Sequence, residues 1–385
     1  MMFLAGGVIA GTGLYFGLKR YISNCRIEIL GQAAEEDEGF KGMRALLDAC
    51  PSLTDPTQAY LIPTAYLCGG MLQTAYSSIQ TLKRDSASDI VYDREPMIMS
   101  DGGTISLDWY PQRATDSSQP IVIIMSGVGG SSYEYHIRCL AKTLDKAGFC
   151  AVVMNHRGLG RTPLTSPKLY NGGDTSDFRD TVQYIHDSFP EAPLLGVAFS
   201  MGAMLLTKYM GEPSALLAGG IVICCPFDMT LTGRLLDADT FANKLSRPLI
   251  VSSQLRIVKR NYDMVKSAGY DMDALMRATR MSEIDTIVTA KACGFKDCWE
   301  LYEAGGTAKY VDHISAPYLV INTMDDPVVP PRGLPLDKIK SNPNTAVAML
   351  KHGGHLGFFT SNLTPRIWYL TPVVEFLQAV VKLPA

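Results

Sequence analysis

The chain has 385 residues, 47% of them hydrophobic, and its 35 basic and 38 acidic residues give a formal net charge of −3 at pH 7. Without a cluster of Lys or Arg, this composition argues against a nucleic-acid-binding protein. The nine cysteines show no metal-like pairing, so they predict buried thiols in a reducing compartment and no zinc site. The length allows one large α/β domain or two ordinary domains.

The chain begins with an apolar segment. Residues 1–18 carry no charged side chain, and Lys19 and Arg20 end the segment. Its length is close to the lower limit of about 17 residues for a membrane-spanning helix, and no basic region precedes it as in a signal peptide. We predict a retained single-pass membrane anchor over 1–20, with a helix lying in the membrane interface or packed on the domain as alternatives. Glycines at the G-x-x-x-G spacing of paired membrane helices suggest a weak homodimer through this segment.

After a mixed lead-in over 21–87, a regular alternation of elements begins. Two β-rich runs, 90–100 and 104–109, flank Asp101-Gly102-Gly103 and predict a β-hairpin at a sheet edge. Apolar runs then predict strands, and helical periodicity predicts helices between them: strands 121–126, 150–155, 194–199, 218–224, 317–322 and 346–350, and helices 137–146, 176–188 and 368–381. This order predicts an α/β fold with a mostly parallel central sheet and helices on both faces.

The segment 228–315 has a largely helical pattern without a core strand. It follows a strand end, where ligands bind in open α/β sheets, and we therefore predict a helical cap over the site. An ordinary subdomain without a role at the site is the alternative. The predicted catalytic domain, cap included, covers 88–385.

One serine lies between a predicted strand and a predicted helix. The strand 194–199 runs directly into Ser200, and Met201 begins the helix. Ala198 and Gly202 complete the small-x-Ser-x-small pattern of a nucleophile elbow, in which strand and helix backbones pass very close to each other. The alternative is a strand end followed by a serine N-cap.

A serine nucleophile needs a histidine base that is oriented by a carboxylate. His352 and His355 both follow the last predicted strand, and the paired glycines between them form a loop that can project His355 over the sheet. We select His355 as the base, while His352 is expected to shape the loop. A structural role for both histidines is the alternative.

The acid is expected directly after the strand 317–322. Asp325 and Asp326 both stand there, and we prefer Asp326 because Pro327 biases it towards an extended conformation. Asp325 remains the alternative. With Ser200 and His355, this choice gives the chain order serine, aspartate, histidine of α/β-hydrolases.

The tetrahedral intermediate needs backbone N–H donors as an oxyanion hole. Met201, the residue after the serine, is expected to supply one donor, and Val128 in the glycine loop 126–130 is expected to supply the other. A phosphate-binding loop is the alternative, but no Gly-Lys-Ser/Thr sequence follows. Such a site requires no metal and no organic cofactor.

Several motifs together resemble the membrane-anchored α/β-hydrolase-domain (ABHD) family, which includes phospholipase and monoacylglycerol lipase types and bacterial YheT-like relatives. The resemblance runs from about Leu61 to the C-terminal helix. It rests on Asp101-Gly102-Gly103, Leu107-Asp108-Trp109, Asn155-His156-Arg157-Gly158, Ser200-Met201-Gly202, Asp325-Asp326-Pro327 and His352-Gly353-Gly354-His355-Leu356-Gly357-Phe358.

The chain departs from this family at the oxyanion loop. Ser126 and Gly129 stand at the His and Thr places of the family's H-G-L-T-G-G sequence, which puts the rigidity of the loop in question. No histidine is followed by an aspartate five residues later, so the acyltransferase motif proposed for some members is absent.

The motifs and the resemblance imply a membrane-associated serine hydrolase that cleaves carboxylic esters of lipids. An esterase or thioesterase acting on small soluble substrates, or a lipid- or steroid-binding protein on a hydrolase scaffold, are the alternatives. The chain has 18 methionines, and we expect some of them to line an adaptable apolar pocket. The orientation is open, because Lys19, Arg20 and Arg26 favour a cytosolic domain whereas the family resemblance suggests the opposite in some members. The endoplasmic reticulum or plasma membrane is expected, and the lipid head group and acyl length stay open.

Overall fold

The computed structural model describes residues 25–31, 41–82, 90–361 and 364–383. The anchor that we predict over residues 1–20 lies outside these ranges. Within them, no helix combines the length and the apolar character that crossing a membrane requires.

The core is a nine-stranded sheet in the order β1-β9-β8-β7-β6-β4-β5-β3-β2. The strands are β1 (Glu28–Leu30), β2 (Asp93–Ile98), β3 (Thr104–Tyr110), β4 (Ile121–Met125), β5 (Cys150–Asn155), β6 (Leu194–Phe199), β7 (Gly219–Ile223), β8 (Tyr318–Thr323) and β9 (Thr345–Leu350). All pairs from β5 to β9 along the sheet are parallel, so their carboxyl ends share one edge. The predicted hairpin is confirmed as β2 and β3 at one antiparallel edge, and β1 pairs antiparallel with β9 at the other.

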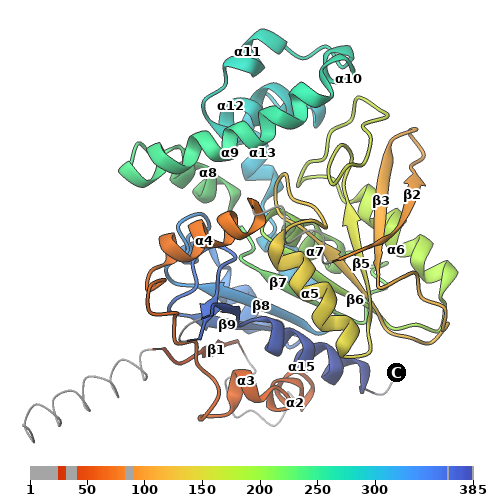
Figure 1. Ribbon diagram of the computed structural model, residues 1–385, viewed down its shortest axis with the longest axis vertical. Helices are drawn as coiled ribbons and strands as arrows, with labels where there is room; N and C mark the ends of the chain where they lie inside the picture. The colour runs from red at the N-terminus through yellow and green to blue at the C-terminus, as the bar shows by residue number, and fades with distance from the viewer. Residues whose placement is uncertain (1–24, 32–40, 83–89, 362–363, 384–385) are drawn as a thin grey trace, which may run out of the picture.

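Helices cover both faces of the sheet, as the sequence predicts (Figure 1). Val122 and Ile124 of β4 point to one face, where α5 (Tyr135–Lys146) and α15 (Leu370–Val381) pack on them. Ile121 and Ile123 point to the other, where α6 (Ser176–Ser188), α7 (Met201–Met210) and α14 (Leu336–Ser341) pack. This alternation explains why the strands are apolar throughout, since both faces are buried.

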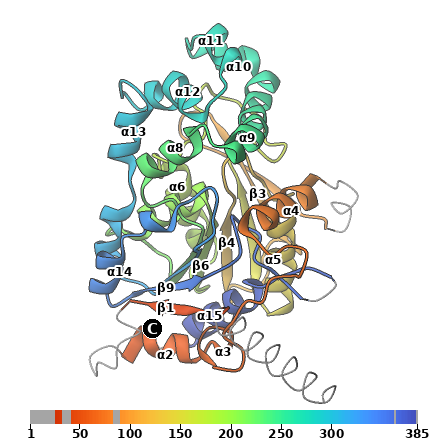
Figure 2. The ribbon, with the colours of Figure 1, turned by 90° about the vertical axis from the view of Figure 1, so that its left-hand side faces the viewer.

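The lead-in packs on this core. It supplies β1 and the helices α2 (Lys41–Asp48), α3 (Pro51–Thr54) and α4 (Gly70–Leu82). Met43, Leu47 and Leu53 join the hydrophobic cluster on the α15 side of the sheet. The helix α4 instead lies beneath the cap, at the side of the molecule (Figures 1 and 2).

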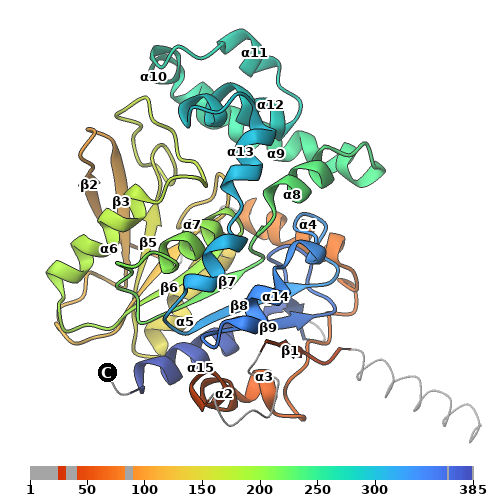
Figure 3. The same ribbon diagram turned by 180° about the vertical axis from the view of Figure 1, so that it is seen from behind.

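The segment between β7 and β8 forms a helical layer above the carboxyl ends of the strands (Figures 1 and 3). It contains α8 (Met229–Asp237), α9 (Phe241–Arg260), α10 (Tyr262–Ser267), α11 (Met272–Arg277), α12 (Met281–Asp285), the π-helix Thr286–Ala290, α13 (Cys298–Gly305) and the 3₁₀-helix Ala308–His313. Val258, Val265 and Leu275 belong to a separate small core within this cap.

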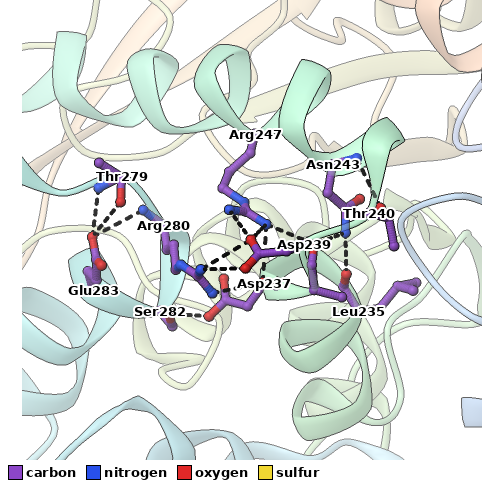
Figure 4. A network of polar contacts seen from close by, with 11 residues as sticks. Leu235, Asp237, Asp239, Thr240, Asn243, Arg247, Thr279, Arg280, Ser282 and Glu283 are labelled. Atoms are coloured by element: carbon purple, nitrogen blue, oxygen red, sulfur yellow. Dashed lines mark hydrogen bonds and ion pairs between the residues drawn. The ribbon is translucent and has the colours of Figure 1, made fainter.

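A polar network fastens the cap helices to one another (Figure 4). Arg247 of α9 and Arg280 at the start of α12 both pair with Asp239, each at 3.2 Å. The Arg280 Nη1 also donates to the backbone carbonyl of Asp237 at 2.8 Å, and the Ser282 hydroxyl donates to the Asp237 carboxylate. Charge-assisted hydrogen bonds to backbone carbonyls fix the angle between α8, α9 and α12 more firmly than the small core of the cap would do alone.

Candidate active site

The turn between β6 and α7 holds Ser200 in a strained conformation. Its φ of 50° and ψ of −118° place a non-glycine residue at positive φ, which is uncommon and occurs mainly at functional sites. The Ser200 N–H donates to the carbonyl of Ile223 at 2.9 Å, which ties the turn to the end of β7. A Cβ at Gly202 would lie 2.4 Å from the carbonyl oxygen of Ser126. Close backbone packing therefore requires a glycine two residues after the serine.

The side chains of Ser200, His355 and Asp326 lie in one hydrogen-bonded line. The His355 Nε2 is 3.0 Å from the Ser200 Oγ, and the His355 Nδ1 is 2.9 Å from the Asp326 Oδ2. The Asp326 carboxylate is fully buried, and its other oxygen accepts the backbone N–H groups of Val328 at 2.7 Å and Val329 at 2.8 Å. These two donors fix the carboxylate so that its free oxygen faces the imidazole.

Asp325 occupies a different position from Asp326. Its Oδ1 accepts the N–H of Gly354 at 2.8 Å, and its Oδ2 lies 3.4 Å from the His352 Nδ1. It therefore shapes the glycine loop that carries His355. Of the two aspartates that the sequence leaves open, the structure brings Asp326 to His355, and His352 takes the loop-shaping position.

A helix far away in the sequence holds the histidine loop. The His355 N–H donates to the Thr74 Oγ1 of α4 at 2.8 Å. Gly354, at φ +59°, packs so tightly on this helix that a Cβ there would lie 2.1 Å from the carbonyl of Gly70. Sequence reasoning missed Thr74, which belongs to the lead-in.

Val128 and Met201 line the same cavity as Ser200 and His355, as expected of oxyanion-hole residues. The loop before Val128 passes close to the nucleophile, because a Cβ at Gly127 would lie 3.2 Å from the Cβ of Ser200. The loop and the start of α7 thus lie next to the serine.

The unusual Ser126 has a partner of its own. Its hydroxyl donates to the Glu134 Oε2 at 2.5 Å, which bridges the loop to the start of α5. Burial raises the pKa of Glu134 to about 7 and lowers the pKa of His136, whose Nε2 is 3.5 Å from the same carboxylate, to about 3. The Ser126–Glu134 bond therefore holds the loop to the start of α5 although the family's histidine is missing.

The larger cavity at the serine has a volume of about 450 Å³ and is mostly apolar. Its walls come from α4, α7, the cap and the loop after β8, and they include a set of methionines: Met71, Met201, Met204, Met229 and Met281. Among the described residues no Lys or Arg lines it, whereas the carboxylates of Asp237 and Asp285 do. Burial raises the pKa of Asp285, which accepts hydrogen bonds from Tyr302 and Thr289.

A smaller cavity of about 80 Å³ lies on the other side of Val128 and Met201, which line both spaces. Tyr170 lines this second cavity, and its buried hydroxyl has no hydrogen-bond partner. Of these two cavities, Ser200 and His355 line the larger one.

One cluster near the site has ligand types that metals use. Possible ligand atoms of Cys224, Asp326 and His355 lie within 4.8 Å of one another. However, burial raises the pKa of the Cys224 thiol well above its ordinary value, and a metal needs the thiolate. Because both His355 nitrogens also have partners, we assign this cluster to the hydrogen-bonded line and not to a metal centre.

Comparisons with known proteins agree with this architecture. Residues 120–361 match the family described as alpha/beta hydrolase fold. Human phospholipase ABHD3 is 28% identical over 88% of this chain and 82% of its own length, and Danio rerio monoacylglycerol lipase ABHD2 is 30% identical over 87% and 82%. The monoacylglycerol lipase of Saccharomyces cerevisiae is 30% identical over 70% of this chain, which spans 61% of that protein.

Among solved structures, the Pyrococcus furiosus esterase Pf2001 is similar in fold, with a TM-score of 0.51 and 18% identity over 78% of this chain and 94% of the esterase. The family match covers most of the chain, and the relatives named above are lipases and phospholipases. The chain therefore belongs to the α/β-hydrolase family, in the branch of the ABHD phospholipases and monoacylglycerol lipases, and is a carboxylic-ester hydrolase.

Proposed function

We propose that Ser200, His355 and Asp326 form a catalytic triad that hydrolyses carboxylic esters of lipids. The observation that carries the proposal is the unbroken line of hydrogen bonds from Asp326 through His355 to Ser200 at the floor of a mostly apolar cavity. A structural serine or histidine would not need such a partner set in a strained turn.

In the proposed reaction, the Ser200 Oγ attacks the acyl carbonyl carbon and its proton passes to the His355 Nε2. The tetrahedral intermediate collapses, the bond to the alcohol breaks, and the alcohol leaves with the proton from Nε2. Water then attacks the acyl-serine, with His355 again taking a proton, and the carboxylic acid and free Ser200 result. Asp326 holds Nδ1 protonated, so that Nε2 faces the serine as a base.

The N–H groups of Val128 and Met201 are proposed to stabilise the oxyanion. The Ser126–Glu134 bridge supports this role, because an oxyanion hole stabilises developing charge only when its donors are held in place beforehand. The methionine-rich walls of the larger cavity suit an acyl chain.

The charges of the cavity favour a neutral substrate. A phosphate group would find no Lys or Arg among the described residues that line the larger cavity, and it would meet the carboxylate of Asp237. Hydroxyl groups, in contrast, can donate to carboxylates. Monoacylglycerol therefore fits better than an anionic phospholipid.

The remaining parts of the proposal rest on the sequence. Residues 1–20 would anchor the enzyme in a membrane and could pair two chains, and 88–385 with the cap 228–315 would form the catalytic domain.

The proposal is tested with a fluorophosphonate probe, which reacts only with an activated serine. Full-length protein in detergent should be labelled, Ser200→Ala should not, and Ser78→Ala, a serine of the same cavity, should be labelled like the wild type. Labelled protein is then given monoacylglycerol, phosphatidylcholine and phosphatidylserine at equal chain length. Equal labelling of Ser200→Ala would refute the triad, and fastest turnover of phosphatidylserine would refute the charge argument.

A further inference from the structure

The helix α4 buries small and polar residues, and Tyr76 is its partly buried apolar contact with the core. Its buried residues are Gly70, Gln73 and Ser77. The polar side chains among them bond inward, since the Gln73 Oε1 accepts the N–H of Phe359 at 2.6 Å and the Ser77 Oγ donates to the carbonyl of Leu356. A helix that borders water normally shows the opposite arrangement, with its apolar stripe facing the core.

The outward side of this segment is apolar and uncharged. Of the twelve large apolar residues that are exposed in the described part of the chain, five lie here, with exposures from 43% for Met71 to 69% for Leu82. They are Tyr66, Met71, Leu72, Ile79 and Leu82, which we call the α4 face. Residues 57–82 contain no charged side chain and no histidine. An exposed apolar patch of this kind marks an interaction site.

The α4 face is continuous with the cavity that holds Ser200. Met71, Ile79 and Leu82 are exposed and also line the cavity. Figure 2 shows α4 at the side of the molecule, directly below the cap helix α9. Three of the five side chains of the α4 face thus also belong to the cavity wall.

We propose that the α4 face docks on the surface of a lipid bilayer and that lipid esters enter the cavity from the bilayer past Met71, Ile79 and Leu82. The proposal rests on the lipid-ester function given above and adds the surface by which the substrate is reached. The chemistry favours lipid over a protein partner, because protein interfaces carry a polar rim with about one hydrogen bond per 100–200 Å², and of the five side chains of the α4 face only that of Tyr66 carries a hydroxyl. Acyl chains need only an apolar path, and here that path leads to the serine.

The first test uses the exposed Cys68, which lies two residues after Tyr66. Cys68 and Cys293 are the exposed cysteines of the described chain, so Cys293→Ser directs a polarity-sensitive maleimide fluorophore to Cys68, and Cys68→Ser directs it to Cys293 in the cap as a matched control. The double variant gives the background. With phosphatidylcholine vesicles, the full-length protein labelled at Cys68 should show a blue shift and a several-fold rise in emission, and the protein labelled at Cys293 should show neither.

An unchanged Cys68 signal on protein that floats with the vesicles would overturn the proposal, because binding would then occur without the α4 face. A Cys68 signal that rises with protein concentration before any vesicles are added would also overturn it, in favour of a second copy of the chain as the partner.

The second test compares two exposed apolar residues. Leu72 belongs to the α4 face but does not line the cavity, and Ile98 is exposed on β2, an edge strand of the sheet. Leu72→Glu should lower hydrolysis of monoacylglycerol in vesicles at least tenfold and change hydrolysis of soluble p-nitrophenyl acetate less than twofold, while Ile98→Glu should change neither rate more than twofold.

Equal rates of Leu72→Glu and wild type on vesicles would overturn the docking role. If Leu72→Glu loses activity on both substrates, Leu72→Gln replaces it, and a loss on both substrates again would assign Leu72 to the fold and overturn the proposal. The proposed lipid-ester function fails separately. In that case the protein labelled at Cys68 shows the expected blue shift with vesicles, but the wild type hydrolyses no lipid ester.

Discussion

Exchanging Asp326 for asparagine is the sharpest test of the proposed triad, because the structure dictates how the new amide must lie. The Asp326 Oδ1 accepts the N–H groups of Val328 and Val329. In Asp326→Asn the amide oxygen must keep these two bonds, and the NH₂ group then faces the His355 Nδ1. Two donors cannot share that contact, so the imidazole must change tautomer and present Nε2–H to Ser200 in place of a lone pair.

The size of the effect follows from this wrong tautomer. In a serine hydrolase, the same exchange lowers kcat by about 10⁴-fold, which corresponds to about 5 kcal/mol of transition-state stabilisation. The side chain of Asp326 is fully buried, so water cannot take its place and soften the loss. The fold should survive, since both backbone bonds to the side chain are kept.

The matched control is Asp325→Asn. The Asp325 carboxylate is one residue away and accepts the N–H of Gly354, a bond that an amide oxygen can keep. Hydrolysis of p-nitrophenyl butyrate by folded protein, checked by circular dichroism, should fall about 10⁴-fold in Asp326→Asn and less than tenfold in Asp325→Asn. The reasoning is refuted if Asp326→Asn keeps more than a tenth of the activity, or if the two variants lose activity equally.

Three further predictions concern the loop beside the serine, the elbow and the cap. Because burial raises the pKa of Glu134 from 4.5 to about 7, this residue contributes stability below pH 4.5 that is lost as the pH rises through 7. Between these two pH values, the melting temperature of the wild type should therefore fall more than that of Glu134→Gln. Gly202→Ala should lower the free energy of unfolding in urea by about 1–3 kcal/mol and kcat by about 10²-fold, whereas Gly305→Ala, where a Cβ meets nothing within 4 Å, should do neither. Asp239→Ala removes the partner of both cap arginines, so limited proteolysis should cut the cap faster while the sheet stays protected; an unchanged cutting rate would contradict the role of this network.

The central strands and the order of the site residues could be predicted because their signals are local. Strands of a parallel sheet that is covered on both faces must be apolar along their whole length, and runs such as 121–126 stand out for that reason. The expected ranges differ from β4 and β9 by one residue at one end, and from β7 and β8 by one residue at each end. Since parallel strands end at one edge, a residue that follows each strand could be expected at a common site without any knowledge of the rest.

Other features could not be predicted because they depend on contacts between distant parts of the chain. The strand β1 is three residues long and partly exposed, so it has no apolar run to reveal it. Thr74 is separated from His355 by 281 residues, and nothing in its neighbourhood marks it as a partner. Glu134, which bonds Ser126, likewise stands at the start of a helix, and nothing in the sequence marks it as a partner of the loop.

The bond between Thr74 and His355 makes the lead-in a support of the proposed catalytic site. The loops after β6, β8 and β9 place Ser200, Asp326 and His355 at one sheet edge by topology alone, but the histidine loop carries paired glycines with positive φ and has little stiffness of its own. The helix α4 supplies that stiffness, because Gly70 lets the loop pack closely on the helix and the Thr74 Oγ1 accepts the His355 N–H. The same helix turns an apolar, uncharged side outward. A displacement of α4 at a lipid surface would therefore also move the His355 imidazole. Docking on the lipid surface would in this way be coupled to the alignment of the base.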